Sequence, residues 1–121
     1  MSKKILIVDD EKDIVELIAL RMKAEGFEAL TAFDGDEALK KAEKHCPDLV
    51  LLDIMMPGVN GYQVARELKK NEATKNIKII MLTAKTGEKD RFWGMESGAD
   101  EYVTKPFEMS MILALVKKLL G

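Results

Sequence analysis

The chain has 121 residues, of which 47% are hydrophobic and 33% are charged, and its formal net charge is −2. This length suits a single domain with a core of its own, and the interspersed acidic and basic residues form no basic stripe for direct binding of nucleic acid. No run of residues is apolar enough to span a membrane, and the N-terminal residues do not resemble a signal peptide, so we expect one cytoplasmic domain over residues 1–121.

The single cysteine, Cys46, and the single histidine, His45, exclude several kinds of site. One cysteine cannot form a disulfide within the chain, and one cysteine beside one histidine is too few for a typical zinc site. A histidine near the end of a predicted helix suits the helix dipole. We therefore expect structural or neutral roles for both residues.

Apolar runs rich in β-branched residues alternate with runs of helical periodicity along the whole chain. Strands are predicted, in chain order, at 4–9, 28–32, 49–53, 78–83 and 102–104. Helices are predicted at 12–25, 35–45, 61–70, 88–97 and 107–120, with glycines 26 and 98 as C-terminal stops. This alternation predicts an α/β fold with a parallel sheet covered by helices on both faces.

Apolar character also predicts where some strands lie in the sheet. The runs at 4–9, 49–53 and 78–83 are continuously apolar, as is typical of central strands that are buried on both faces. The run at 28–32 is weaker and alternates, which favours a position nearer an edge.

Polar side chains gather where these predicted strands end. Asp9 and Asp10 close the first strand, Asp53 the third and Thr83 the fourth, while Lys105 follows the fifth. Because ligands of such sheets bind beyond the carboxyl ends of the strands, we expect these five side chains to converge on one site.

Each of these residues also has an ordinary structural interpretation. Asp9, Asp10 and Glu11 would suit the start of a helix as capping residues, and Asp53 would suit the start of a turn. Taken together, however, three neighbouring carboxylates repel one another unless a cation lies among them. The group therefore indicates a metal site.

The chemistry of the candidate ligands indicates which metal. All are oxygens, which favours a hard cation, and two or three carboxylates with room for water suit Mg²⁺, for which Mn²⁺ can substitute. A metal ion opposite an ammonium, Lys105, and a hydroxyl, Thr83, is also suited to holding a phosphoryl group. Asp53 at the centre is then a candidate nucleophile, since carboxylates attack phosphorus to form acyl phosphates.

The motifs ILIVDDE, PDLVLLDIMMPGVNG, IIMLTA and GADEYVTKPF occur here in one particular order and spacing. Through these motifs the chain resembles the receiver domain of a two-component response regulator, in particular the single-domain chemotaxis type. The resemblance extends over its whole length. The resemblance implies a doubly wound, flavodoxin-like (βα)5 three-layer sandwich with strand order 2-1-3-4-5.

The resemblance also implies a role for each site residue. Asp53 would accept a phosphoryl group from a phosphohistidine of a sensor histidine kinase or phosphotransfer protein, so that the chain catalyses only its own phosphorylation and dephosphorylation. Mg²⁺ would be bound by Asp9, Asp10, Asp53 and the carbonyl of Met55. The phosphoryl group would be bound by Thr83, the amide of Ala84 and Lys105. Thr83 and Tyr102 would be the switch residues. The bond between Lys105 and Pro106 would be cis.

An output surface is implied at helix 88–97, strand 102–104 and helix 107–120. The apolar side chains of the last helix cover an arc of roughly 200°, about twice what packing on a sheet requires. The adjacent Phe92 and Trp93 cannot both face the core. Two interpretations stay open: a broadly buried helix with one half-exposed aromatic, or a surface for an effector or a homodimer.

The residues two positions after Asp53 and Thr83, namely Met55 and Lys85, are where the family tunes the lifetime of the acyl phosphate. An apolar Met55 cannot orient the attacking water, so we expect self-dephosphorylation to take minutes or longer.

Other classes of protein fit the sequence less well. A haloacid-dehalogenase-type Mg²⁺ phosphatase needs a second acid two residues after its nucleophile, where this chain has Met55. A flavodoxin-like FMN binder needs a phosphate loop rich in glycine and hydroxyl groups after the first strand, where this chain has the acidic VDDEKD. A degenerate receiver would lack some pocket residues, and a lone histidine argues against a histidine kinase or phosphotransfer protein.

Overall fold

The structure is a computed structural model of the chain, and it describes residues 2–54, 56, 60–83 and 98–121. The predicted helix 88–97 lies outside the described residues. The helices and strands are β1 (Lys4–Val8), α1 (Lys12–Ala24), β2 (Glu28–Ala32), α2 (Gly35–His45), β3 (Leu49–Asp53), α3 (Gly61–Lys70), β4 (Lys78–Thr83), β5 (Glu101–Thr104) and α5 (Met109–Leu120).

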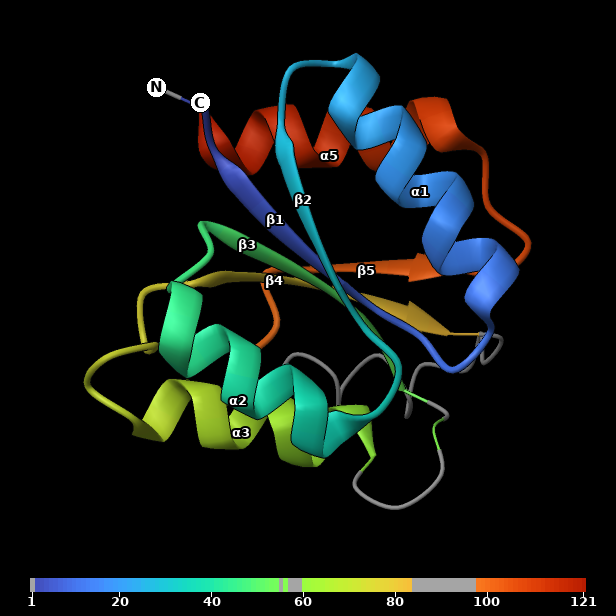
Figure 1. The fold of residues 1–121 in the computed structure, drawn as a ribbon. Coiled ribbons are helices and arrows are strands. Elements are labelled where there is room, and N and C mark those ends of the chain that lie inside the picture. The colour runs from blue at the N-terminus through green and yellow to red at the C-terminus, as the bar shows by residue number, and fades with distance from the viewer. Residues whose placement is uncertain (1, 55, 57–59, 84–97) are drawn as a thin grey trace.

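The five strands form one parallel sheet in the order β2-β1-β3-β4-β5 (Figure 1). This is the doubly wound, flavodoxin-like order that the family resemblance implied, and it confirms the predicted fold class. The alternating strand β2 lies at an edge, and every residue of β3 is buried, as the apolar pattern predicted.

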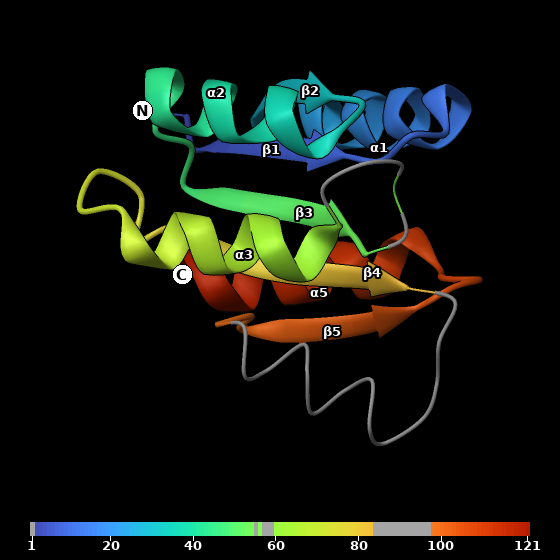
Figure 2. The same ribbon diagram turned by 90° about the horizontal axis from the view of Figure 1, so that it is seen from below.

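Helices cover both faces of the sheet, with α1 and α5 on one face and α2 and α3 on the other (Figures 1 and 2). Two hydrophobic clusters fill the spaces between these layers. Alternate residues of the central strands supply the two clusters, so that Ile7 and Leu51 point to the α1 and α5 side while Leu6 and Val50 point to the other. This period of two is what a strand buried on both faces requires.

The ends of the helices follow from local sequence. Gly26 follows α1 with a φ of +94°, a left-handed conformation that glycine adopts without strain. At the start of α3 the Asn60 side chain accepts a hydrogen bond from the Gln63 amide, and the Gln63 side chain accepts one from the Asn60 amide. This reciprocal capping fixes where the chain turns from the end of β3 into α3.

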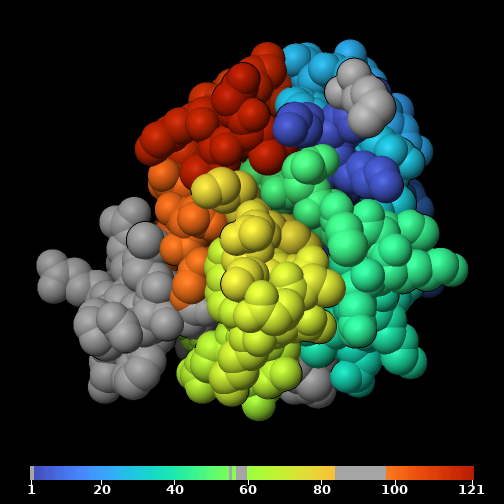
Figure 3. Space-filling view, turned by 90° about the vertical axis from the view of Figure 1, so that its left-hand side faces the viewer, coloured from blue at the N-terminus to red at the C-terminus, as the bar shows by residue number. Residues whose placement is uncertain are grey.

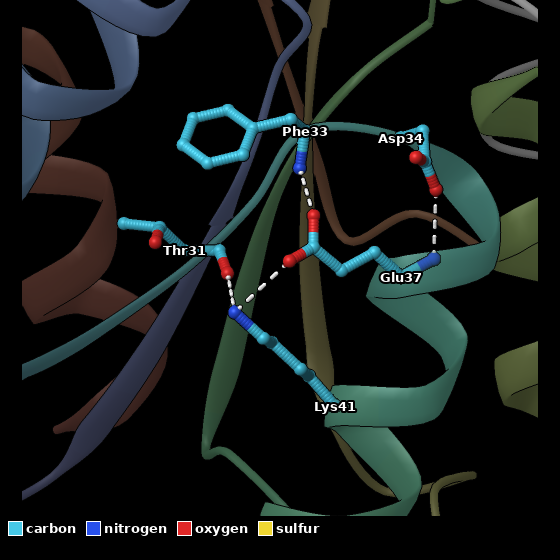
Figure 4. Close-up of polar contacts among 5 residues, drawn as sticks. All are labelled: Thr31, Phe33, Asp34, Glu37 and Lys41. Carbon is cyan, nitrogen blue, oxygen red and sulfur yellow. Dashed lines mark hydrogen bonds and ion pairs between the residues drawn. The ribbon is translucent and has the colours of Figure 1, made fainter.

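A network of polar contacts holds the corner between β2 and α2 (Figure 4). Glu37 accepts a hydrogen bond from the Phe33 amide at 2.7 Å, and Asp34 caps the helix by accepting one from the Glu37 amide at 2.8 Å. Lys41 pairs with the other carboxylate oxygen of Glu37 at 3.1 Å and donates to the carbonyl of Thr31. The corner is therefore tied at the backbone of both the strand and the helix.

Several predicted boundaries shift by one or two residues. Strand β1 ends at Val8 instead of residue 9: the Asp9 amide still bonds the Ala32 carbonyl of β2, but its side chain turns to the Glu11 amide and to Lys105. Helix α5 begins at Met109 instead of residue 107, after the N-cap Glu108. His45 ends α2, as predicted, and the exposed Cys46 is its C-cap in a left-handed conformation with a φ of 45°.

The strands begin at the end of the molecule that faces the viewer in Figure 3, and they end at the opposite side. Both termini of the chain lie at this amino-terminal end of the sheet (Figures 1 and 2). Among the helices that the structure describes, none is both long and apolar enough to cross a membrane.

Candidate functional site

Three carboxylates from distant parts of the sequence meet at the carboxyl end of the sheet. Asp9 and Asp10 follow β1, and Asp53 is the last residue of β3, which pairs with β1. One oxygen of each residue lies within 4.8 Å of the others. Asp9 and Asp53 are buried and Asp10 is exposed. The predicted acidic cluster therefore exists, and its like charges call for a cation.

Lys105 supplies one positive charge to this cluster. Its Nζ donates a hydrogen bond to Asp9 Oδ2 at 2.9 Å and lies 3.7 Å from Asp53 Oδ1. Burial lowers the pKa of Lys105, but the hydrogen bond to Asp9 and the charges of Asp53, Asp9 and Glu11 together outweigh burial, so the pKa lies above its ordinary value. The peptide bond between Lys105 and Pro106 is cis, as predicted.

Replacing Lys105 tests its role as the internal counter-ion. Lys105→Met should lower the free energy of unfolding in metal-free buffer at neutral pH by about 2 kcal/mol, because two buried carboxylates lose a charged partner. Because the pKa of Lys105 is raised in the folded state, its charge stabilises the fold fully below pH 10.5, the pKa in the unfolded chain. This stabilisation is lost as the pH rises through the higher pKa of the folded state. The difference in free energy of unfolding between wild type and variant, measured in urea, should thus stay constant up to about pH 9 and shrink above the pKa of the unfolded chain.

Lys118→Met is the matched control for this measurement. Lys118 pairs with Glu101 at 2.9 Å, but its side chain is 67% exposed, so the loss should stay below about 1 kcal/mol. A Lys105 effect that already fades between about pH 7 and 9 would contradict the assignment.

Thr83 and Tyr102 occupy the neighbouring strands β4 and β5. Thr83 ends β4 and is fully buried, and its carbonyl accepts a hydrogen bond from the Lys105 amide at 2.6 Å. Tyr102 pairs with Met81 in the sheet and packs in the core cluster on the α2 and α3 side, where it is 9% exposed. Both predicted switch residues therefore lie on adjacent strands, and Thr83 stands at the carboxyl end of the sheet where the acidic cluster lies.

The helix-capping interpretation of the acidic run does not describe its contacts. The N-cap of α1 is Glu11, whose side chain makes no capping hydrogen bond. Asp9 instead accepts a hydrogen bond from the Glu11 amide at 3.0 Å through Oδ1, while its Oδ2 faces Lys105. The Asp9 carboxylate is thus oriented from two sides within the cluster.

Gly61 is a site residue that sequence reasoning missed. A Cβ built at this first residue of α3 would lie 2.6 Å from the Asp53 carbonyl oxygen and 2.7 Å from Ile54 Cα. The Gly61 amide also donates to the Ile54 carbonyl at 3.1 Å. The backbone that carries Asp53 is therefore packed directly against α3. The signal in the sequence was a glycine directly after the helix cap Asn60, a position where a glycine favours close backbone approach.

Two predicted site residues, Met55 and Ala84, lie outside the described residues, as do Lys85, Phe92 and Trp93. The described residues nonetheless bring Asp9, Asp10, Asp53, Thr83 and Lys105 to the ends of four neighbouring strands.

The family model for the response regulator receiver domain matches residues 5–117. This chain belongs to the response regulator receiver domain family. Membership favours the receiver interpretation over a haloacid-dehalogenase-type phosphatase or an FMN binder. Receiver domains act in two-component signalling through phosphorylation by a kinase, and they bind Mg²⁺.

Known proteins resemble this receiver domain over nearly its full length. It is 47% identical over 120 residues to the alkaline phosphatase synthesis transcriptional regulatory protein PhoP of Bacillus subtilis, covering 99% of this chain and 49% of that protein. The chain thus spans about half the length of that curated relative.

Solved structures give the same family. The chemotaxis protein CheY4 of Vibrio cholerae superposes with a TM-score of 0.93 at 30% identity, covering 98% of this chain and 99% of that one. The BeF3-activated DrrB receiver domain, from a Thermotoga maritima response regulator, superposes with a TM-score of 0.90 at 32% identity and covers 99% and 98% of the two chains.

Proposed function

We propose that this receiver domain, over residues 1–121, accepts a phosphoryl group on Asp53 from a phosphohistidine of a sensor histidine kinase or phosphotransfer protein. The observation that carries the proposal is the placement of the Asp53 carboxylate, which ends a fully buried strand beside two further carboxylates and 3.7 Å from the Lys105 ammonium. Three acidic residues and one lysine from three separate strands thus meet at one point, an arrangement suited to a cation and a phosphoryl group.

The donor set of the cluster fits a magnesium ion. Asp9, Asp10 and Asp53 offer oxygens within 4.8 Å of one another, and oxygen donors suit Mg²⁺ or Mn²⁺. These residues, with the carbonyl of Met55, would hold the ion. When bound, it neutralises charge on the carboxylates and on the phosphoryl oxygens.

The residues of the chain then have separate tasks in the transfer. A carboxylate oxygen of Asp53 forms a bond to phosphorus while the bond from phosphorus to the histidine nitrogen breaks, and the imidazole leaves with that electron pair. Lys105, whose raised pKa keeps it protonated, contributes a fixed positive charge for the phosphoryl oxygens. The Thr83 hydroxyl and the Ala84 amide would donate hydrogen bonds to the remaining oxygens.

Phosphorylation would be reported through Thr83, Tyr102 and the surface of β5 and α5. In this proposal Thr83 moves toward the added charge and Tyr102 adjusts beside it, which shifts the domain between two packings. On α5 three apolar residues are buried, whereas Met111 is 57% exposed. An exposed methionine on α5 supports a contact surface for an effector or a homodimer.

Acetyl phosphate tests the central claim. We expect the intact mass of the protein to rise by one phosphoryl group in Mg²⁺ buffer and to stay unchanged when EDTA is present, because the carboxylates then repel the anionic donor. Peptide mapping should place the group on Asp53. A protein that gains no phosphate in Mg²⁺, or gains as much in EDTA, would refute the proposal.

The same experiment measures the lifetime of the acyl phosphate. After the donor is removed, the phosphorylated mass should persist for minutes or longer, since an apolar Met55 gives the attacking water no hydrogen-bond partner. Loss within seconds would contradict this part of the proposal without affecting the identity of the acceptor.

A further inference from the structure

Lys12 is a cation at the start of α1 among four acidic residues, and neither the metal site nor the phosphoryl site described above uses it. Asp9, Asp10 and Glu11 precede it and Asp13 follows it. A positive charge in the first turn of a helix is unfavourable with the helix dipole. The position of this lysine therefore requires a separate explanation.

The ring of Phe33 gives the ammonium of Lys12 a defined place. Lys12 Nζ lies 5.7 Å from the centroid of this ring, within the range of a cation–π contact. Phe33 is partly buried against the core cluster on the α1 and α5 side, and Glu37 accepts the hydrogen bond of its amide (Figure 4). Phe33 is thus held in place through both its side chain and its backbone, and its ring forms a fixed platform for the flexible Lys12 side chain.

This contact lies beside the acidic cluster. Phe33 directly follows Ala32, whose carbonyl accepts a hydrogen bond from the Asp9 amide at 3.3 Å. In the strand order, β2 leads to Phe33 on one side of Asp9, and β5 leads to Lys105 on the other side. The acidic cluster is therefore flanked by Lys105 on one side and by Lys12 on the other.

The two lysines differ in what they contact. Lys105 pairs directly with Asp9 and Asp53, whereas Lys12 is exposed and rests on an uncharged ring. The exposed charge of Lys12 therefore adds a positive contribution, screened by salt, to the field at the rim of the site. Phosphodonors are anions, and they must approach a cluster of three carboxylates.

We propose that Lys12, held over the ring of Phe33, is a steering residue that attracts the anionic phosphodonor to Asp53. The inference rests on the proposed phosphoacceptor function. The same charge opposes binding of the metal cation to the acidic cluster, so removing it should affect the two ligands in opposite directions. A purely structural role of Lys12 would not have this effect.

Four variants test the proposal by the second-order rate of phosphorylation with acetyl phosphate at saturating Mg²⁺ and low ionic strength. Lys12→Met should slow the reaction about two- to fourfold, whereas Lys12→Arg, which keeps the charge and stacks on the ring, should stay near wild type. Phe33→Leu, which keeps the lysine but removes the aromatic ring beneath it, should lower the rate by part of the amount seen in Lys12→Met. Lys23→Met, an equal charge change at the exposed far end of α1, should have no effect.

Salt separates steering from a structural defect. In about 0.5 M salt, where the Debye length is only ~4 Å, the gap between wild type and Lys12→Met should close. A slowing that persists at high salt, a Lys12→Met rate equal to that of Lys23→Met at low salt, or a wild-type rate in Phe33→Leu would each overturn the proposal.

Metal binding gives a second measurement that does not depend on phosphorylation. Titration with Mn²⁺, followed by loss of the EPR signal of the free ion, should show about two- to threefold tighter binding by Lys12→Met than by wild type. Equal affinities would overturn the proposal even if the wild type gains no phosphate. A wild type that gains no phosphate while Lys12→Met binds Mn²⁺ more tightly would instead refute only the phosphoacceptor function.

Discussion

Asp53→Asn is expected to reduce phosphorylation by acetyl phosphate in Mg²⁺ from a full phosphoryl group per chain to none. The side-chain amide is neutral and lacks the anionic oxygen that attacks phosphorus. It also removes one of the three carboxylates that lie within 4.8 Å of one another. Intact mass measured after incubation with the donor gives the result directly.

The effect of Asp53→Asn on the free energy of unfolding should also change sign when metal is added. In EDTA it should be more stable than wild type by about 1–2 kcal/mol, because repulsion from Asp9 and Asp10 is removed and exceeds the lost attraction to Lys105. With Mg²⁺ at 100 times its dissociation constant, wild type should gain about 2.7 kcal/mol and the variant much less. Urea unfolding with and without Mg²⁺ measures both effects.

Asp36→Asn is the matched control, since Asp36 is an exposed acid of the first turn of α2 outside the cluster. It should be phosphorylated as wild type is and respond equally to Mg²⁺. An Asp53→Asn protein that still gains phosphate, or that is stabilised by Mg²⁺ as much as wild type, would show that another residue is the acceptor.

Gly61→Ala is expected to lower the free energy of unfolding by about 1–3 kcal/mol, opposite in sign to the usual glycine-to-alanine change in a helix. The added Cβ would meet backbone atoms of Asp53 and Ile54 at 2.6 and 2.7 Å, and backbone in a buried strand cannot move aside as a flexible side chain can. A shift of Asp53 by a few tenths of an ångström should also slow its phosphorylation by roughly tenfold.

Gly26→Ala separates this clash from ordinary backbone strain. Gly26 has a φ of +94°, but a Cβ there would meet no atom within 4 Å. Its replacement should cost about 1 kcal/mol through strain and leave the phosphorylation rate unchanged. If Gly61→Ala proves as stable and as rapidly phosphorylated as wild type, the contact between α3 and the Asp53 backbone has no role in positioning the acceptor.

Much of this fold was predictable because local pattern and tertiary environment agree. The continuous apolar run at 49–53 predicted a strand buried on both faces, and β3 is buried throughout. The order of the strands came from the family resemblance, since periodicity does not specify which strands are neighbours. Two of the boundaries that shifted lie at a polar side chain or a helix cap, namely Asp9 after β1 and Glu108 before α5.

The candidate site was predictable to the extent that it lies at strand ends. The carboxyl edge of a parallel sheet gathers such residues whatever their separation in sequence, and Lys105 meets Asp9 across 96 positions. Sequence did not reveal that Lys105 hydrogen-bonds Asp9 and lies farther from Asp53. It also missed Gly61 and the pairing of Lys12 with Phe33, because a close backbone approach and a ring contact depend on how separate elements pack.

The tie between Lys41 and Thr31 has a consequence for the open side of the sheet. Strand β2 lies at an edge, and an edge strand offers unpaired carbonyls to any extended chain that approaches. The Thr31 carbonyl is instead bound by an ammonium that is also paired with Glu37. A second molecule that tried to extend the sheet there would have to displace this charge, so the contact protects the domain from edge-to-edge aggregation.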